Sequence, residues 1–297
     1  MRTSEKPAFT NAQDFVEFFR KGGEVHRKKE SLPNLLIDNR LDPKAIKVLG
    51  EELATGIQVM RKRIIDLLNE LRRLVPPGRE LRDPDILGLL FGPGFAKSDG
   101  ARSNAIEVLR WYTSPATLLN YRDAIMQALK EPPTNAYVLL LVAKAKPLEA
   151  WEEVDRQSRL PEWRDKPAMR IARAALGDTR IEDEYIAAAE RAEAAGWAEG
   201  LDENLSTLSW IGTPRSLRFI CLRFRSPLII KGAGGYDRLV RTEAVNALRY
   251  AYPGEVALDT DFITNEEGFT RAEAFCARTF GVNYAGIPRP PYPPPGY

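Results

Sequence analysis

The sequence contains very few residues that bind metals or form covalent cross-links. Cys221 and Cys276 are the only cysteines, and His26 is the only histidine among 297 residues. A disulfide framework, a zinc site of thiolates or imidazoles, and a nucleophile activated by histidine all need more of these side chains. We therefore expect no metal site, no cofactor and a reducing compartment.

Charge excess and long apolar runs are also missing. The 43 basic and 41 acidic residues leave a net charge of +2, so we expect no overall attraction to nucleic acid or to an acidic membrane. The longest apolar run, residues 137–143, is far shorter than the roughly 20 residues that span a bilayer. Because the first residues also lack the apolar segment of a signal peptide, we expect a cytoplasmic protein without membrane insertion.

Two segments far apart in the chain are similar to each other. GARSNAIEVLRWYTSPATLL at 100–119 aligns with GYDRLVRTEAVNALRYAYPGEVAL at 235–258, and the paired residues are Arg102 with Arg241, Ala105 with Ala244, Ile106 with Val245, Leu109 with Leu248, Arg110 with Arg249, and Trp111 with Tyr250. Leucines that end an apolar helical pattern before a turn recur at Leu109, Leu141, Leu176, Leu208 and Leu248. Such spacing predicts a repeated unit of two helices.

Helix start signals lie between these patterns. Thr213 is a predicted N-cap, and Pro214 is a predicted first helical residue, because proline has its φ already fixed near the helical value there. TRIE at 179–182 and TRAE at 270–273 have the spacing of a capping box, so each predicts the start of a helix. The second of these helices is expected to end at Gly281.

The segment TLSWIGTPRSLRFICLRF at 207–224 resembles the short HEAT-like repeat family, of which armadillo-type repeats are close neighbours. In that family an apolar helix ends at glycine and a small polar residue, and proline then opens a second apolar helix. The similarity extends over residues 83–258. It implies an all-α, right-handed superhelix in which each helix pair buries its apolar face against the next pair.

The remaining sequence adds terminal regions to this array. We expect an irregular N-terminal arm with one short helix near 12–20, a long capping helix, a HEAT-like repeat array and a proline-rich tail, at 1–40, 41–78, 79–284 and 285–297. Apolar residues between 42 and 75 recur in steps of three and four, as in a coiled coil. This seam predicts packing of the long helix on the first repeats, or alternatively a homodimer through it.

The tail differs from the rest of the chain. PRPPYPPPGY at 288–297 contains six prolines, which favour polyproline II and exclude helix. Its form suits aromatic-lined grooves, and Tyr292 and Tyr297 are its predicted contact residues. We expect deletion of 288–297 to leave thermal unfolding nearly unchanged while it weakens assembly.

Charge is distributed unevenly near the end of the array. Residues 178–206 carry nine acidic and two basic side chains, whereas residues 213–242 carry seven basic and one acidic. The two regions neutralise each other, form a surface for a protein partner, or bind phosphate. Since arginine is enriched in protein interfaces, the predicted contact residues are Arg215, Arg218, Arg223 and Arg225.

The predicted function is a non-catalytic scaffold, or a structural subunit, that binds other proteins. An enzyme is the alternative, because WEEVD at 151–155 is similar to a Trp-x-x-Val-Asp segment of HEAT-like alkylpurine DNA glycosylases. That resemblance implies Asp155 as the catalytic carboxylate and Trp151 as an aromatic wall. A distant relative of the bilin lyases, whose repeats are similarly short, is the other enzyme considered.

Overall fold

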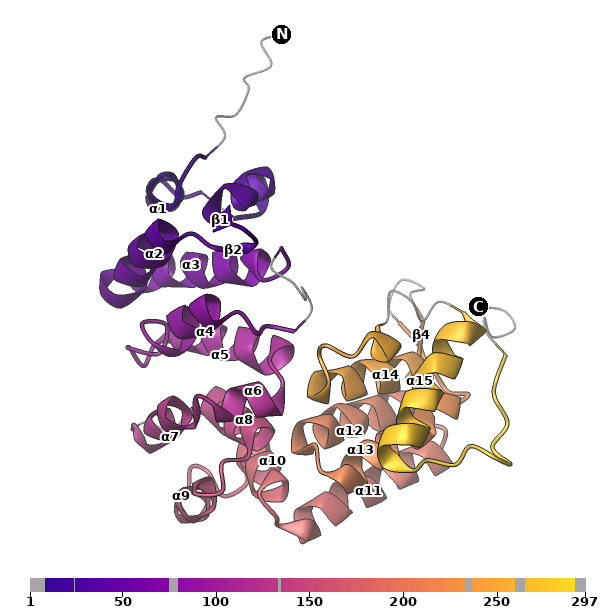
Figure 1. Cartoon of the computed structure of the whole chain (residues 1–297). Coiled ribbons are helices and arrows are strands. Elements are labelled where there is room, and N and C mark those ends of the chain that lie inside the picture. Colours follow the sequence, from indigo (N-terminus) through magenta and orange to yellow (C-terminus); the bar gives the residue numbers. More distant parts are fainter. Residues whose placement is uncertain are drawn as a thin grey trace. The chain divides into compact units, whose positions relative to one another are not determined.

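The computed structural model describes residues 9–23, 25–74, 80–132, 135–232, 237–259 and 265–291, which form helices for the most part (Figure 1). The predicted all-α class is confirmed. Strands occur in the described residues only as two short antiparallel hairpins, Leu36–Ile37 (β1) with Arg40–Leu41 (β2), and Ile229–Ile230 (β3) with Arg238–Leu239 (β4). None of the described helices has the length and apolar character needed to cross a membrane.

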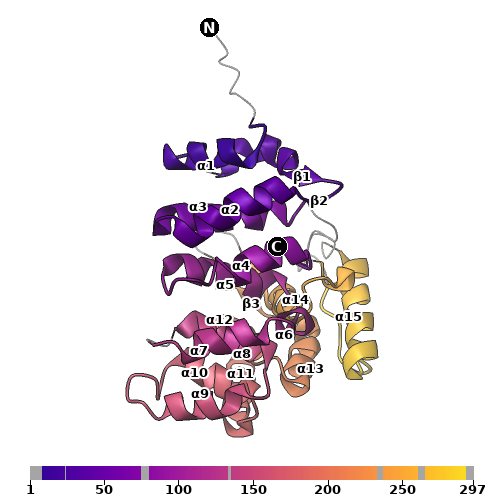
Figure 2. The same ribbon diagram turned by 60° about the vertical axis from the view of Figure 1, so that its left-hand side comes forward.

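The chain separates into two compact units. The first comprises Met1–Thr113 with Asn120–Ala128, and the second comprises Ser114–Leu119 with Leu129–Tyr297. The described helices of the first unit up to Thr113 are α1 (Ala12–Arg20), η1 (Val25–Leu35), α2 (Pro43–Thr55), α3 (Gln58–Leu71), α4 (Pro84–Phe91) and α5 (Gly100–Tyr112). Helix α1 packs on α2 and α3, α2 packs on α4, and α3 packs on α5, so that these helices form successive layers (Figure 2).

Residues 9–23 and 25–40 contain more regular structure than an irregular arm. The short helix expected near 12–20 is confirmed as α1. Its Phe15 and Phe19 are fully buried, as is Leu35 at the end of η1. The apolar face of α1 therefore joins the core of the first unit, whereas the sequence predicted that this segment lies in an irregular arm.

The long helix expected over 42–75 is in fact two helices. Asp42 and Pro43 start α2 as predicted, because the Asp42 carboxylate accepts the Lys44 N–H at 2.9 Å. The helix then stops at Gly56, whose backbone is extended, and a Cβ there would lie 2.5 Å from the Glu52 carbonyl oxygen. Most of the predicted seam, including Leu49 and Ile64, is fully buried within the unit, so these side chains are already covered by the chain itself.

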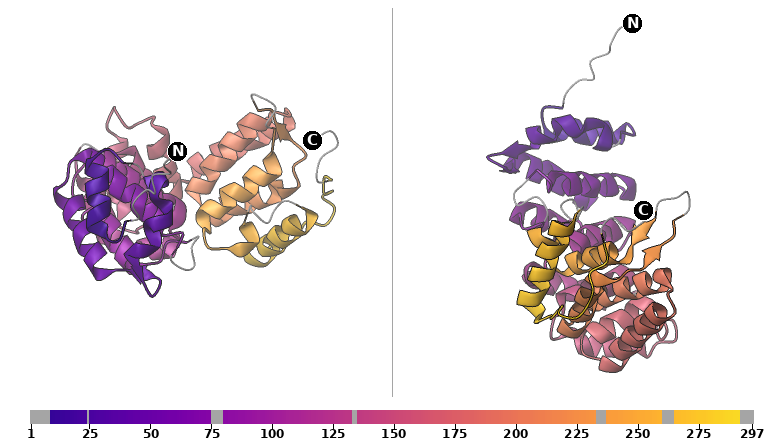
Figure 3. Two further views of the ribbon diagram at one scale, coloured as in Figure 1. Left: turned by 90° about the horizontal axis from the view of Figure 1, so that it is seen from above. Right: turned by 90° about the vertical axis from the view of Figure 1, so that its right-hand side faces the viewer.

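The second unit continues the helical pattern. Its helices are α6 (Pro115–Leu119), α8 (Ala136–Ala145), α9 (Ala150–Ser158), α10 (Pro167–Ala175), α11 (Thr179–Ala194), α12 (Ala198–Ile211), α13 (Pro214–Leu222), η2 (Arg223–Arg225), α14 (Val240–Ala251), η3 (Val256–Leu258) and α15 (Glu266–Phe280). Helix α7 (Arg122–Lys130) runs from the first unit into the second. Neighbours pack as α8 on α10, α11 on α12, α12 on α14 and α13 on α15. Figure 3 gives two further views of the chain.

Two predicted capping boxes have other roles. Helix α11 does begin at Thr179, but Glu182 turns toward α13, where its carboxylate accepts the hydroxyl of Ser216 at 2.6 Å and that of Thr213. Residues 270–273 lie inside α15, which starts at Glu266. The predicted start of α13 is confirmed, because Thr213 caps it and Pro214 opens it, and so is the end of α15 at Gly281.

A lysine links two loops beside Glu182. Lys146 ends α8 in the left-handed region, at φ 53°, and its ammonium donates to the Gly212 carbonyl oxygen at 2.6 Å. Burial lowers the pKa of Lys146 to about 8, although the Glu182 carboxylate acts in the opposite direction. A hydrogen bond from the Lys146 ammonium therefore joins the α8–α9 loop to the end of α12, and this ammonium loses its proton in mildly alkaline solution.

We expect this lysine to make stability rise with pH in an alkaline window. Between pH 8 and about 10.4, the usual pKa of lysine, the unfolded chain binds more protons at this residue than the folded chain does. The free energy of unfolding of wild type minus that of Lys146→Met should therefore increase from pH 8 to pH 10. Urea denaturation of both proteins at each pH measures this difference, in which other titrating groups cancel. A constant difference would show that Lys146 titrates normally.

The aligned segments correspond in burial as well as in sequence. Ala105, Ile106 and Leu109 on α5 are fully buried, as are Ala244, Val245 and Leu248 on α14. Arg102 and Arg241 are also buried, and both donate to backbone carbonyls. Arg102 binds the Phe95 oxygen at 2.6 and 2.9 Å, and Arg241 binds the Pro290 and Pro291 oxygens at 2.7 Å each.

Candidate functional site

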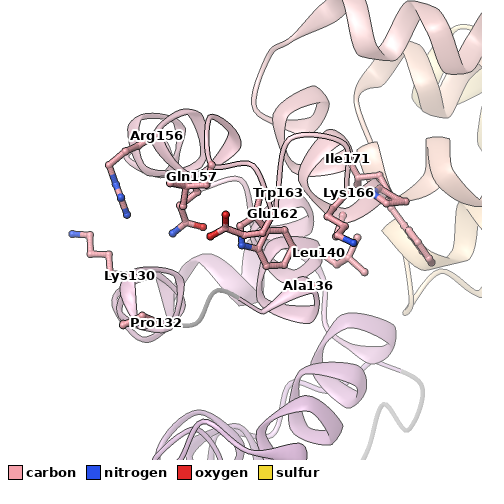
Figure 4. A pocket seen from close by; sticks show the side chains of 14 residues that line it. Lys130, Pro132, Ala136, Leu140, Arg156, Gln157, Glu162, Trp163, Lys166 and Ile171 are labelled. Atoms are coloured by element: carbon pink, nitrogen blue, oxygen red, sulfur yellow. The ribbon is translucent and has the colours of Figure 1, made fainter.

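A pocket of about 730 Å³ lies in the second unit, among the end of α7 and helices α8, α9 and α10 (Figure 4). We call it the α8–α10 pocket. Its volume is within the range of sites that hold small molecules or side chains of a partner. Ala136 and Leu140 of α8 and Ala168 and Ile171 of α10 supply apolar walls.

The loop between α9 and α10 forms one side of this pocket. The chain continues past Ser158 in consecutive turns, with hydrogen bonds from Leu160 N to Gln157 O, from Trp163 N to Leu160 O, and from Lys166 N to Trp163 O. These turns repeat every three residues and therefore bring the side chains of Leu160, Trp163 and Lys166 to the pocket. Pro167 then opens α10, and Trp210 of α12 adds a second tryptophan to the lining.

A buried glutamine holds α9 against the end of α7. The Gln157 amide donates to the Leu129 carbonyl oxygen at 2.8 Å and to the Glu153 carboxylate at 2.6 Å. Arg156 donates to the same carboxylate, from Nε to Oε2 at 3.0 Å. The hydrogen bond from Arg156, reinforced by that from Gln157 and opposed by burial, lowers the pKa of Glu153. Glu153 is thus ionised at neutral pH and fixes this wall of the pocket.

Cationic side chains lie at both ends of the pocket. Figure 4 shows Lys130 and Arg156 at one end and Lys166 at the other, with Glu162 and Trp163 between them. Lys166 is exposed, and within the described part of the chain neither Lys130 nor Lys166 forms an ion pair. The pocket therefore combines an apolar interior with two lysines that have charge to offer a ligand.

The arginines predicted to bind a partner are mostly engaged within the chain. Arg215 pairs with Asp183 of α11, and Arg223 donates to Glu193 of α11 at 2.8 Å while it stacks on Phe219. The acidic and basic regions thus neutralise each other between α11 and α13.

Arg225 contacts the C-terminal part of the chain instead. It donates to both Glu273 oxygens, at 3.0 and 2.9 Å, and to the Tyr284 carbonyl oxygen at 2.8 Å. Arg218 is exposed. Tyr292 and Tyr297 lie outside the described residues, so their predicted contacts stay predictions.

The residues of the glycosylase resemblance lie on α9 but do not line the α8–α10 pocket. Asp155 is paired with Arg159 one turn later, and the Trp151 side chain is partly exposed. Arg156, Gln157 and Leu160 are the residues of this region that line the pocket. Among the described residues, no group of three or more histidine, cysteine or acidic side chains is placed to hold a metal ion.

Sequence reasoning missed the α8–α10 pocket. The only local signal is Trp163, a large aromatic residue in the polar stretch between two helices, where such a residue has no helical face to join. The all-α class does not select an activity, because one fold hosts many functions. Comparisons with protein-family models, with curated proteins and with solved structures find no match for this chain.

Proposed function

We propose that this protein is a non-catalytic scaffold or assembly subunit that docks a segment of another protein in the α8–α10 pocket. The observation that carries the proposal is the composition of this pocket, in which aliphatic and tryptophan side chains form the interior and lysines stand at its ends. Protein interfaces bury apolar and aromatic anchors in such pockets and surround them with polar groups.

The surrounding architecture supports a scaffold. We propose that the helices form short HEAT-like repeats, since α5 and α14 bury the same positions of a shared pattern and each carries a buried arginine in its first turn. Stacked repeats present an extended surface that suits protein partners. Arg218, together with Tyr292 and Tyr297, remains a proposed secondary contact.

A matched pair of leucines tests the proposal. Leu160 lines the pocket and is 36% exposed, whereas Leu148, before α9, is 94% exposed and does not line it. A photoreactive amino acid at position 160, introduced into the protein in its native cell, is expected to cross-link one defined polypeptide. The same probe at position 148 should not cross-link it.

The cross-linked polypeptide then serves for a quantitative measurement. Purified wild type should bind it, Leu160→Asp should weaken binding at least about tenfold by placing a charge in the apolar interior, and Leu148→Asp should leave binding unchanged. Both variants should retain the wild-type circular dichroism. Equal cross-linking from both positions, or undiminished binding by Leu160→Asp, would rule out docking in this pocket.

A further inference from the structure

We infer that the α8–α10 pocket selects an acidic peptide, in which an apolar residue lies between carboxylates. This inference rests on the proposed function and specifies the chemistry of the segment that docks. It follows from the placement of charge along the pocket, with Lys130 and Arg156 at one end, Lys166 at the other, and apolar side chains between them.

The two ends are suited to carboxylates. Lys166 has no ion-pair partner within the described residues, so a carboxylate placed beside it forms a new pair and breaks none. Lys130 forms no close ion pair there either, although its charge contributes to the lowered pKa of Glu153, so a ligand carboxylate would share Lys130 with Glu153. Arg156 is different, because its Nε and Nη2 atoms already donate to Glu153. The Arg156 charge is therefore partly neutralised, and Lys130 is the principal cation at its end.

The middle of the pocket is suited to an uncharged side chain. Ile171 and Leu140 provide an aliphatic surface, and Trp163 provides a flat ring. The exposed Glu162 carboxylate lies between the cationic ends, where it repels an acidic side chain and accepts hydrogen bonds from peptide N–H groups. An acidic residue is thus favoured at each end and disfavoured at the centre.

The same lysines and tryptophans would also attract a nucleic acid strand, which docks through phosphates and stacked bases. Two observations favour the peptide. The carboxylates of Glu153 and Glu162 stand among the cations and repel a continuous row of phosphates. Aliphatic side chains also form more of the lining than aromatic rings, and they complement a branched or aromatic side chain better than a polar base.

Four short peptides test the inference on the full-length protein. Each carries acetyl and amide ends and a zwitterionic rhodamine label, and fluorescence anisotropy gives the dissociation constant. The first is Gly-Asp-Glu-Phe-Glu-Asp-Gly. The second replaces its acids with Asn and Gln, the third replaces them with Lys, and the fourth replaces Phe with Gly. We expect the first to bind about ten times more tightly than the second at low salt, and this preference to shrink at high salt.

Charge reversal identifies the cations that select the peptide. Lys130→Glu and Lys166→Glu should each weaken binding of the acidic peptide about five- to tenfold, with little effect on the neutral one. Arg164→Glu is the matched control, because Arg164 is exposed in the same loop but does not line the pocket. It should change binding less than twofold.

The outcomes separate this inference from the proposed function. Equal binding of the acidic and neutral peptides, with both lost in Leu160→Asp, overturns acidic selection and leaves docking in the pocket intact. Peptide binding that Leu160→Asp does not reduce, or no binding of any peptide, counts against the docking proposal and the inference together. Tighter binding of a 12-nucleotide oligothymidine than of the acidic peptide, with the same dependence on both lysines, overturns the peptide assignment.

Discussion

Replacing Arg61 with methionine is expected to lower the free energy of unfolding by about 3 to 5 kcal/mol, because the change leaves several buried groups without a partner. Arg61 is fully buried on α3. Its Nε donates to the Leu53 carbonyl oxygen at 2.7 Å, and its Nη2 donates to the Pro93 and Gly94 carbonyl oxygens at 3.3 and 3.2 Å. One side chain thus binds the end of α2 and the loop after α4.

The same guanidinium also supports the start of α5. Its Nη1 pairs with Asp99, which caps α5 by accepting the N–H groups of Ala101 and Arg102 at 2.9 and 3.2 Å. Methionine fills a similar volume but donates no hydrogen bond. The loss of unfolding free energy should therefore exceed what a change in core volume alone would cause. Helix α5 should also be held less firmly in place.

Urea denaturation followed by circular dichroism measures this effect. Arg73→Ala is the control, because Arg73 is half exposed just after α3 and pairs only with Glu70 at 3.2 Å in the described structure. An exposed pair of this kind contributes at most about 1 kcal/mol. Similar denaturation midpoints for Arg61→Met and Arg73→Ala would mean that the buried hydrogen bonds of Arg61 do not stabilise the first unit.

Replacing Arg241 with methionine is expected to lower the free energy of unfolding by about 2 to 4 kcal/mol and to release the proline-rich segment. Arg241 is 1% exposed, donates to the Pro290 and Pro291 carbonyl oxygens, and lies over the Phe269 ring at 4.6 Å. Proline has no N–H, but its carbonyl remains a full acceptor. Removing the guanidinium should thus make the chain near residue 290 accessible to proteases.

Deletion of residues 288–297 provides a double-mutant cycle with this variant. From the sequence alone, we expected this deletion to leave unfolding nearly unchanged. In the structure, however, the deletion removes both carbonyl acceptors and leaves the Arg241 guanidinium buried with fewer partners. We now expect the deletion to destabilise the protein. The deletion also removes Arg289, which pairs with Glu266 and Glu273, so it should cost more than Arg241→Met alone. If the Arg241 contact is already lost in the deletion, adding Arg241→Met to it should cost much less than the same substitution in the full chain.

Arg271→Ala controls for loss of a surface arginine in this region, because Arg271 is half exposed and pairs with Glu267 on the same helix. The carbonyl contacts would not contribute to stability if Arg241→Met lowered the free energy of unfolding while the deletion left it unchanged.

The sequence predicted helices best where a local signal determines the structure. Thr213 and Pro214 start α13, and Gly281 ends α15 in the left-handed conformation, because capping and glycine geometry act within a few residues. Gly56 shows the limit. The apolar spacing of three and four continues across it, so the pattern predicts one helix, although the backbone is extended there.

Tertiary partners of charged residues could not be predicted. Glu182 and Glu273 both have the spacing of a capping box, yet one binds hydroxyl groups of α13 and the other pairs with Arg225 and Arg289. Burial acts to raise the pKa of Glu273, but hydrogen bonds from these two arginines lower it overall. The same sequence spacing serves either purpose, since the partner that decides between them lies on another helix.

The α8–α10 pocket was missed for a related reason. Lys130 and Lys166 are 36 residues apart in the chain, and each alone is an ordinary surface lysine. Their common pocket exists only because α8 packs on α10 and the loop after α9 turns every three residues. Loop geometry of this kind is not encoded in apolar periodicity.

In each contact between a buried arginine and a backbone carbonyl, the arginine is harder to replace than the residue that supplies the carbonyl. Arg61, Arg102 and Arg241 recognise backbone oxygen, which every amino acid supplies, so these bonds leave the side chains at 93–95 and 290–291 free to vary. Gly94 and Phe95 are the exceptions, because a Cβ at Gly94 would clash with the Leu90 carbonyl oxygen and the Phe95 ring is buried. The arginine has no such freedom, since no other side chain presents the same fork of donors. Loops joined in this way can diverge in sequence and acquire new surface chemistry while the helices behind them keep their packing.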